Sequence, residues 1–311
     1  MRVLALLLRV LALLWLAGAA QAAPPPPQHL DDTGLFEAGS STAVRPENLA
    51  FAPQYELWSD GAAKRRWLYL PPGASIDASR PDAWEFPPGT KAWKEFSQGR
   101  RVETRLIERL PDGAWRFVAY VWNAEGTQAV LAPEAGIAAL PVAGAPRGRY
   151  TIPSRSDCLA CHEGAEVPLL GFSALQLARE LERLAASGRL RNLPASLLAS
   201  PPRIAAPSES ARAALGYLHA NCGHCHNHTG PLAATGLAFA QQAAAPQASA
   251  ERTLHSLSSA GTSVDVVRRV RSSNPYVRMP PVGVSLIDAK NVALIESWIR
   301  HDLRLPLEPY P

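Results

Sequence analysis

The sequence predicts an α+β protein in which a β-rich part precedes an all-helical part. Residues 102–122 alternate apolar and polar side chains around the turn Pro111-Asp112-Gly113, a pattern typical of a β-hairpin. After residue 149 the apolar period changes to that of helices. Residues 132–149, between the two parts, are rich in Ala, Pro and Gly and are therefore expected to form a connection.

The chain begins with a segment that has the three regions of a secretory signal peptide, residues 1–22. Arg2 precedes an apolar run from Leu4 to Leu16 that only Arg9 interrupts, and the small residues that end at Ala22 form a cleavage site. A membrane anchor is the alternative, but a membrane span needs about 20 apolar residues and this run is shorter. We therefore expect export to a bacterial periplasm and a mature chain without an integral membrane span.

The β-rich domain is expected over residues 30–149. Turn signals such as Asp60-Gly61 and Pro87-Pro88-Gly89 separate short apolar runs, which predicts a β-sandwich or a barrel-like domain. Six of the eight tryptophans lie between Trp58 and Trp122. We expect them to pack against the sheet, and a platform for a ligand or partner is the alternative role.

Helical patterns occupy two later segments, residues 150–207 and residues 208–305. Capping residues predict helix starts at Ser173, Ser208 and Asp288. Each start is followed by apolar residues with helical spacing, and on the second helix this face ends at a cysteine. The stripe of the last helix is the widest and contains Val292, Ile295, Trp298, Ile299 and Leu303.

All four cysteines fall in two copies of one motif, Cys158-Leu-Ala-Cys161-His162 and Cys222-Gly-His-Cys225-His226. Cys-x-x-Cys-His is the attachment signature of c-type haem. One helical turn separates the two thiols, so both can reach the haem vinyl groups while the adjacent imidazole faces the iron. The sequence therefore predicts two covalently bound haem c groups, with His162 and His226 as iron ligands.

Three other uses of these cysteines are the alternatives. They are two short disulfides, one zinc site made of the four cysteines, and a thioredoxin-like redox pair. A zinc site of four cysteines does not call for a histidine after each pair. No βαβ pattern surrounds either motif, as a thioredoxin-like pair requires. Haem attachment is therefore the favoured interpretation.

The sixth iron ligand distinguishes the two predicted haems. Met1 belongs to the predicted signal peptide, and the only other methionine, Met279, sits between Arg278 and two prolines just before the last helix. This order is that of a single-haem cytochrome c domain, which predicts a His226/Met279 pair and a higher potential than two histidines would give. Packing of Met279 in a core gap is the alternative.

The first haem has no methionine left to use. Its sixth position is open to a histidine, a rarer ligand such as Lys or Tyr, water, or nothing. The candidate histidines all lie on the helical side of the chain: His219, His224, His228, His255 and His301. For each of them, a solvated or hydrogen-bonded histidine without a ligand role is the alternative.

With these motifs, the predicted fold class becomes an N-terminal β-sandwich or barrel-like domain followed by an all-α cytochrome c-type dihaem region. The formal net charge of +4 would be offset by about four haem propionates. Lys and Arg are dispersed, and no basic stripe with interleaved aromatics suggests nucleic acid. The expected partners are periplasmic redox proteins, as electron donor and acceptor.

The chain resembles a family of bacterial exported dihaem c-type cytochromes with an N-terminal β domain. The resemblance covers most of the mature chain and implies haem binding and electron transfer, but it supplies no substrate. His228 departs from cytochrome c domains, in which a glycine-rich turn is more usual. The matching stretches are Tyr55-Glu-Leu-Trp-Ser-Asp-Gly-Ala-Ala-Lys64, Phe86-Pro-Pro-Gly-Thr-Lys91, Tyr120-Val-Trp-Asn123, Asp157-Cys-Leu-Ala-Cys-His162, Asn221-Cys-Gly-His-Cys-His-Asn227 and Arg278-Met-Pro-Pro281.

Three functions fit the sequence. The first is an electron carrier without catalytic residues. The second is a dihaem peroxidase or oxidase, in which the haem at His162 reacts with peroxide while the other haem stores an electron. The third is a binding role for the aromatic-rich β domain, with the haems as sensors, which rests on composition alone.

Overall fold

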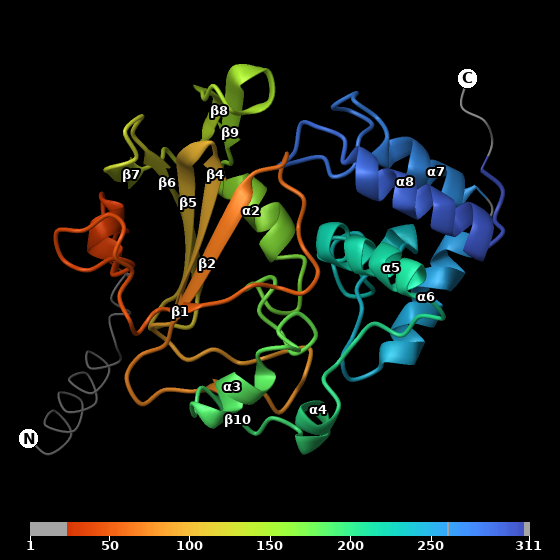
Figure 1. Ribbon diagram of the computed structural model, residues 1–311, viewed down its shortest axis with the longest axis horizontal. Coiled ribbons are helices and arrows are strands. Elements are labelled where there is room, and N and C mark those ends of the chain that lie inside the picture. Colours follow the sequence, from red (N-terminus) through yellow and green to blue (C-terminus); the bar gives the residue numbers. More distant parts are fainter. Residues whose placement is uncertain (1–23, 260, 308–311) are drawn as a thin grey trace, which may run out of the picture.

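The computed structural model describes residues 24–259 and 261–307, so the predicted signal peptide lies outside the described residues (Figure 1). Its main element is a six-stranded sheet in the order β1-β2-β4-β5-β6-β7, and every neighbouring pair is antiparallel. The strands are β1 (Leu49–Ala50), β2 (Ala63–Tyr69), β4 (Lys91–Gln98), β5 (Arg100–Arg109), β6 (Trp115–Trp122) and β7 (Ala129–Leu131). The predicted hairpin is confirmed as the β5–β6 pair.

The two faces of this sheet are covered differently. One face carries three of the sheet's tryptophans and packs against η1 (Leu30–Thr33) and the residues that follow it. Trp67, Trp93 and Trp122 are buried there, which confirms a packing role for these three tryptophans. The opposite face looks toward the helices, and α2 (Arg155–His162) lies against β6 on that side (Figure 1).

Seven short α-helices occur in the described part of the chain. They have between 5 and 13 residues. After α2 they are α3 (Leu181–Ala186), α4 (Ala195–Ala199), α5 (Glu209–Asn221), α6 (Pro246–Ser258), α7 (Thr262–Val270) and α8 (Ala289–Ser297). Within the two described ranges, none has the length and hydropathy needed to cross a membrane.

The predicted fold class is wrong in both of its parts. The β-rich part is one open sheet and not a sandwich or barrel, because chain and helices cover its faces in place of a second large sheet. The later part is not an all-α haem region. It contains β9 (Arg149–Ile152), which pairs with β8 (Ile137–Pro141), and β10 (Leu190–Arg191), which pairs in parallel with β3 (Ile76–Asp77).

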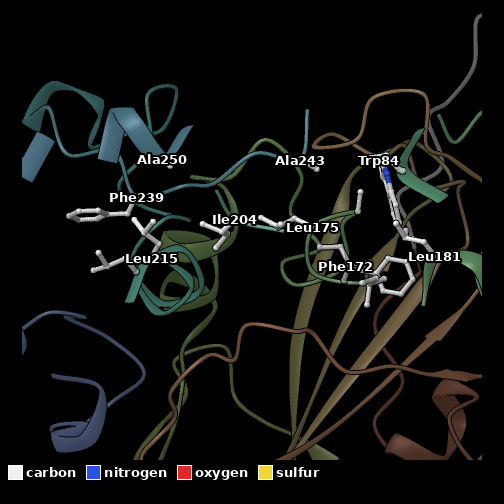
Figure 2. Packing of buried hydrophobic residues seen from close by; sticks show 14 of the residues in the cluster. Trp84, Phe172, Leu175, Leu181, Ile204, Leu215, Phe239, Ala243 and Ala250 are labelled. Atoms are coloured by element: carbon white, nitrogen blue, oxygen red, sulfur yellow. The ribbon is translucent and has the colours of Figure 1, made fainter. Parts of the chain in front are cut away.

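One apolar core joins the sheet side to the helices. It runs from Leu68 and Trp84 through Phe172 to Leu215 and Trp298, and Figure 2 shows part of this continuous row. Helices this short cannot bury a core of their own, so they pack against the sheet and its loops. That shared burial is the physical reason why a separate helical domain does not form.

The capping signals had different outcomes. Ser208 caps α5, where its Oγ accepts a hydrogen bond from Ala211 N at 3.1 Å. Asp288 caps α8 in the same way, with a bond of 3.2 Å from Asn291 N. The start predicted at Ser173 is wrong, because turns occupy the chain up to residue 180 and α3 begins only at Leu181.

Candidate functional site

The first Cys-x-x-Cys-His motif occupies the end of α2. A capping box fixes the start of this helix, since Ser154 Oγ accepts from Asp157 N at 3.1 Å and Asp157 Oδ2 accepts from Ser154 N at 2.9 Å. The helical spacing then places Cys158 and Cys161 on one side of α2. His162 ends the helix, and its ring lies 5.0 Å from the ring of Phe117 on β6.

His162 is held in the form that can bind a metal through Nε2. Its Nδ1 lies 2.5 Å from the carbonyl oxygen of Pro168, and because a carbonyl only accepts, Nδ1 carries the proton. Nε2 therefore keeps its lone pair. Burial lowers the pKa of His162 to about 4, and the positive charges of Lys94 and Arg105 act in the same direction. The imidazole is neutral at pH 7, as iron ligation requires.

The second motif begins where α5 ends. Cys222 is the C-cap residue, and the chain turns back so that His226 N donates to Cys222 O at 2.8 Å. The His226 ring packs edge-on against Phe239 with 5.8 Å between ring centroids. Burial, with His224 and Arg269 nearby, lowers the pKa of His226. Its buried Nδ1 has no hydrogen-bond partner among the described residues.

The two motifs meet in space. The ligand atoms of Cys161, His224 and Cys225 all lie within 4.8 Å of one another. Cys225 Sγ also approaches the carbonyl oxygen of Ala160 at 3.5 Å. A hydrogen bond to Cys225, together with burial, raises the pKa of the Cys161 thiol to about 12. Residues far apart in the sequence thus form one cluster at the junction of α2 and α5.

Asn227 and two glycines hold this junction together. Asn227 is buried, and its Nδ2 donates to Gly164 O, beside the first motif, at 2.9 Å. A Cβ atom at Gly164 would meet His224 O at 2.8 Å, and one at Gly230 would meet Gly164 O at 2.8 Å. The two loops therefore approach more closely than side chains at these positions would permit.

Met279 lies apart from this junction. It lines a small pocket that also contains Cys222 of the second motif, Trp58 and Tyr217. The backbone N of Met279 donates to Arg269 O at 3.1 Å, which fixes the loop to α7. The pocket includes Cys222 and Met279 but not His226. The structure thus brings Met279 to one cysteine of the second motif, and the His226/Met279 pair stays a prediction.

The other histidines differ in their ability to bind a metal. His219 Nδ1 accepts a hydrogen bond from Gln241 N at 3.1 Å, so its neutral form carries the proton on Nε2 and offers no free lone pair. Three more of the five candidate histidines are exposed to solvent: His228, His255 and His301. Of the five candidates for the first haem, only His224 stands beside a motif cysteine of that haem.

The donor set fits covalently held haem better than the alternatives do. All four cysteines are free thiols. They do not gather at one point, because Cys158 and Cys222 are outside the cluster of Cys161, His224 and Cys225. Each motif instead presents two thiols and one neutral imidazole, which is the set that c-type haem uses. The described residues therefore form neither the two short disulfides nor the single four-cysteine zinc site.

A row of basic residues beside His162 was missed by the sequence reasoning. The registers of β2, β4 and β5 pair Arg66 with Lys94 and Lys94 with Arg105, on the face toward α2. In the sequence each of them has an apolar residue on one side and a polar residue on the other, so no pattern sets them apart. Only the folded sheet shows that these residues are neighbours and half-buried.

The comparisons with known proteins do not extend this description. No family model matches the chain, and neither the curated proteins nor the solved structures give a match.

Proposed function

We propose that this protein is a periplasmic dihaem c-type cytochrome that transfers electrons between redox partners. The observation that carries the proposal is the meeting of Cys161 and Cys225, one from each Cys-x-x-Cys-His motif, within 4.8 Å. Groups attached at these two cysteines would have their attachment edges side by side. Such an arrangement suits a relay in which an electron entering at one centre leaves from the other.

Each haem, when bound, supplies a one-electron iron couple whose potential is set by its ligands and surroundings. Cys158 and Cys161 hold the first group, and the bond from His162 Nδ1 to Pro168 O at 2.5 Å orients the imidazole. Cys222 and Cys225 hold the second group. Phe117 and Phe239 pack against the two imidazoles.

The test is the covalent haem content of the purified protein. We expect the intact mass under denaturing conditions to exceed that of the mature polypeptide by two haems. Changing both cysteines of one motif to serine should remove one haem and leave the other. A protein that carries no haem and four titratable thiols would contradict the proposal.

A zinc protein is the outcome to separate from this one. The cluster of Cys161, His224 and Cys225 could bind zinc through two thiolates and one imidazole. His224→Gln is therefore an informative variant. We expect it to keep both covalent haems, whereas loss of one equivalent of zinc in a haem-free protein would assign the cluster to that metal.

A dihaem peroxidase is the second candidate function. It is favoured by the positions of the candidate histidines: His219 accepts a hydrogen bond, three others are exposed, and His224 is the one found beside a cysteine of the first motif. An open sixth position would let peroxide reach the iron. A high-spin signal in the electron paramagnetic resonance spectrum of the oxidised protein, with peroxide turnover, would favour the enzyme. Two low-spin signals would favour the carrier.

A further inference from the structure

The sheet face that meets the first motif carries adjacent cations. Arg66 on β2, Lys94 on β4 and Arg105 on β5 are direct cross-strand neighbours. Lys64 lies two residues before Arg66 and points to the same face. Like charges directly opposite each other destabilise a sheet. A row of this kind therefore calls for a negative group to offset it.

Among the described residues, only one end of the row has a carboxylate in an ion pair. Arg105 is paired with Glu103 through two bonds of 2.7 and 3.0 Å, and Glu103 also accepts from Tyr150. Lys64, Arg66 and Lys94 have no ion pair within the described part of the chain. Burial lowers the pKa of Lys64 and Arg66, and the exposed Glu56 opposes this only in part. Burial, with the charges of Arg66 and Arg105, lowers the pKa of Lys94 well below its ordinary value, so Lys94 needs an anion beside it to stay charged.

The first motif lies on this same face. Phe117, which packs against His162, is the register partner of Ile107, and Ile107 shares its face of β5 with Arg105. Arg105 acts electrostatically on Cys158, and both Arg105 and Lys94 act on His162. The row thus begins at Arg105 on β5, which acts on Cys158, passes Lys94 on β4, which acts on His162, and continues to Arg66 on β2, away from Cys158.

We infer that Lys64, Arg66 and Lys94 bind the propionate carboxylates of the haem held at Cys158, Cys161 and His162. The inference rests on the proposed function. Haem carries its two propionates on the edge away from the vinyl groups, and the row extends away from Cys158. Lysine and arginine are the side chains that pair best with carboxylates in a partly desolvated site.

A role of Lys94 as the sixth iron ligand is the competing assignment. A single ligand would explain one lysine near His162 but not a cluster, since Arg66 and Arg105 remain charged and do not ligate iron. Lys94 also stacks at 4.9 Å on the ring of Phe96, which Arg105 approaches from its own strand at 4.4 Å. The cluster as a whole therefore favours an anion as its partner.

The test is a redox titration of each haem in the purified holoprotein. Lys94→Gln and Arg66→Gln should each lower the potential of the first haem, because unneutralised propionates favour ferric iron. We expect the ratio of oxidised to reduced haem at a fixed potential to rise about tenfold, which is about 59 mV for one electron. The potential of the second haem should not change.

Two further variants make the outcome specific. Lys91→Gln changes the same residue type on β4, but on the opposite face, where Lys91 donates to Thr33 O at 2.9 Å. It should leave both potentials unchanged. Lys94→Arg keeps the charge and should retain the potential of the first haem. It also keeps the inference testable if Lys94→Gln does not accumulate as holoprotein.

Three results would overturn the inference. Attached haem with unchanged potentials in Lys94→Gln and Arg66→Gln would show that the row does not face the propionates. A low-spin to high-spin change in both Lys94 variants, but not in Arg66→Gln, would make Lys94 an iron ligand. Absence of covalent haem from the unmodified protein would instead refute the proposed function, and the inference with it.

Discussion

Replacing Asn227 with alanine removes the side chain that joins the two motif loops. Its Nδ2 donates to Gly164 O at 2.9 Å and to Gly223 O at 3.1 Å. Its Oδ1 accepts from Gly230 N at 2.6 Å and Thr229 N at 3.0 Å. At about 1 kcal/mol for each buried bond, with a discount for the more exposed Thr229, the unfolding free energy should fall by about 2–4 kcal/mol.

Urea unfolding followed by far-ultraviolet circular dichroism measures this loss. Asn274→Ala is the matched control, because Asn274 is exposed and its Oδ1 accepts one turn bond of 3.0 Å, from Tyr276 N. The control should change the unfolding free energy by less than about 0.5 kcal/mol. If Asn227→Ala were equally mild, Asn227 would not hold the junction and the reasoning about it would fail.

Three more measurements probe other parts of the molecule. Ser154→Ala removes the capping box of α2 and should cost about 1 kcal/mol in the same urea assay, whereas no loss would mean that contacts with β6 alone fix the helix. Met279→Ala should lower the potential of the second haem and alter only its spectrum, and an unchanged spectrum would exclude Met279 as its ligand. Burial lowers the pKa of His219 to about 4, so the unfolded chain takes up that proton first as the pH falls below about 6.5. Between pH 7 and pH 5 the wild type should therefore lose about 1–2 kcal/mol more stability than His219→Gln, and equal losses would contradict a buried neutral imidazole.

Local signals in the sequence were the ones that predicted structure well. The hairpin between β5 and β6 and the N-caps at Ser208 and Asp288 depend on a few neighbouring residues, and all three are confirmed. The helix start predicted at Ser173 is wrong because residues 173–180 pack in turns, and this packing outweighed the capping pattern. Local preference is a weak guide where buried contacts decide.

The sequence pattern did not predict how distant segments of the chain pack against one another. Alternation shows that a strand has two faces, but not what covers each face, so one open sheet was mistaken for a sandwich or barrel. The spacing within each cysteine motif could be read directly, whereas the contact between Cys161 and Cys225 depends on how α2 and α5 pack. The cations around Lys94 were missed for the same reason.

The continuous core has a consequence for how the molecule comes apart. Since apolar residues from Leu68 on β2 to Trp298 after α8 belong to one buried cluster, neither half of the chain retains a complete interior when it is cut from the other. A fragment of residues 208–305 would expose the apolar side chains through which it now belongs to this cluster. Sheet and helices should therefore melt in a single cooperative transition, and the relative position of the two motifs should persist until the whole fold is lost.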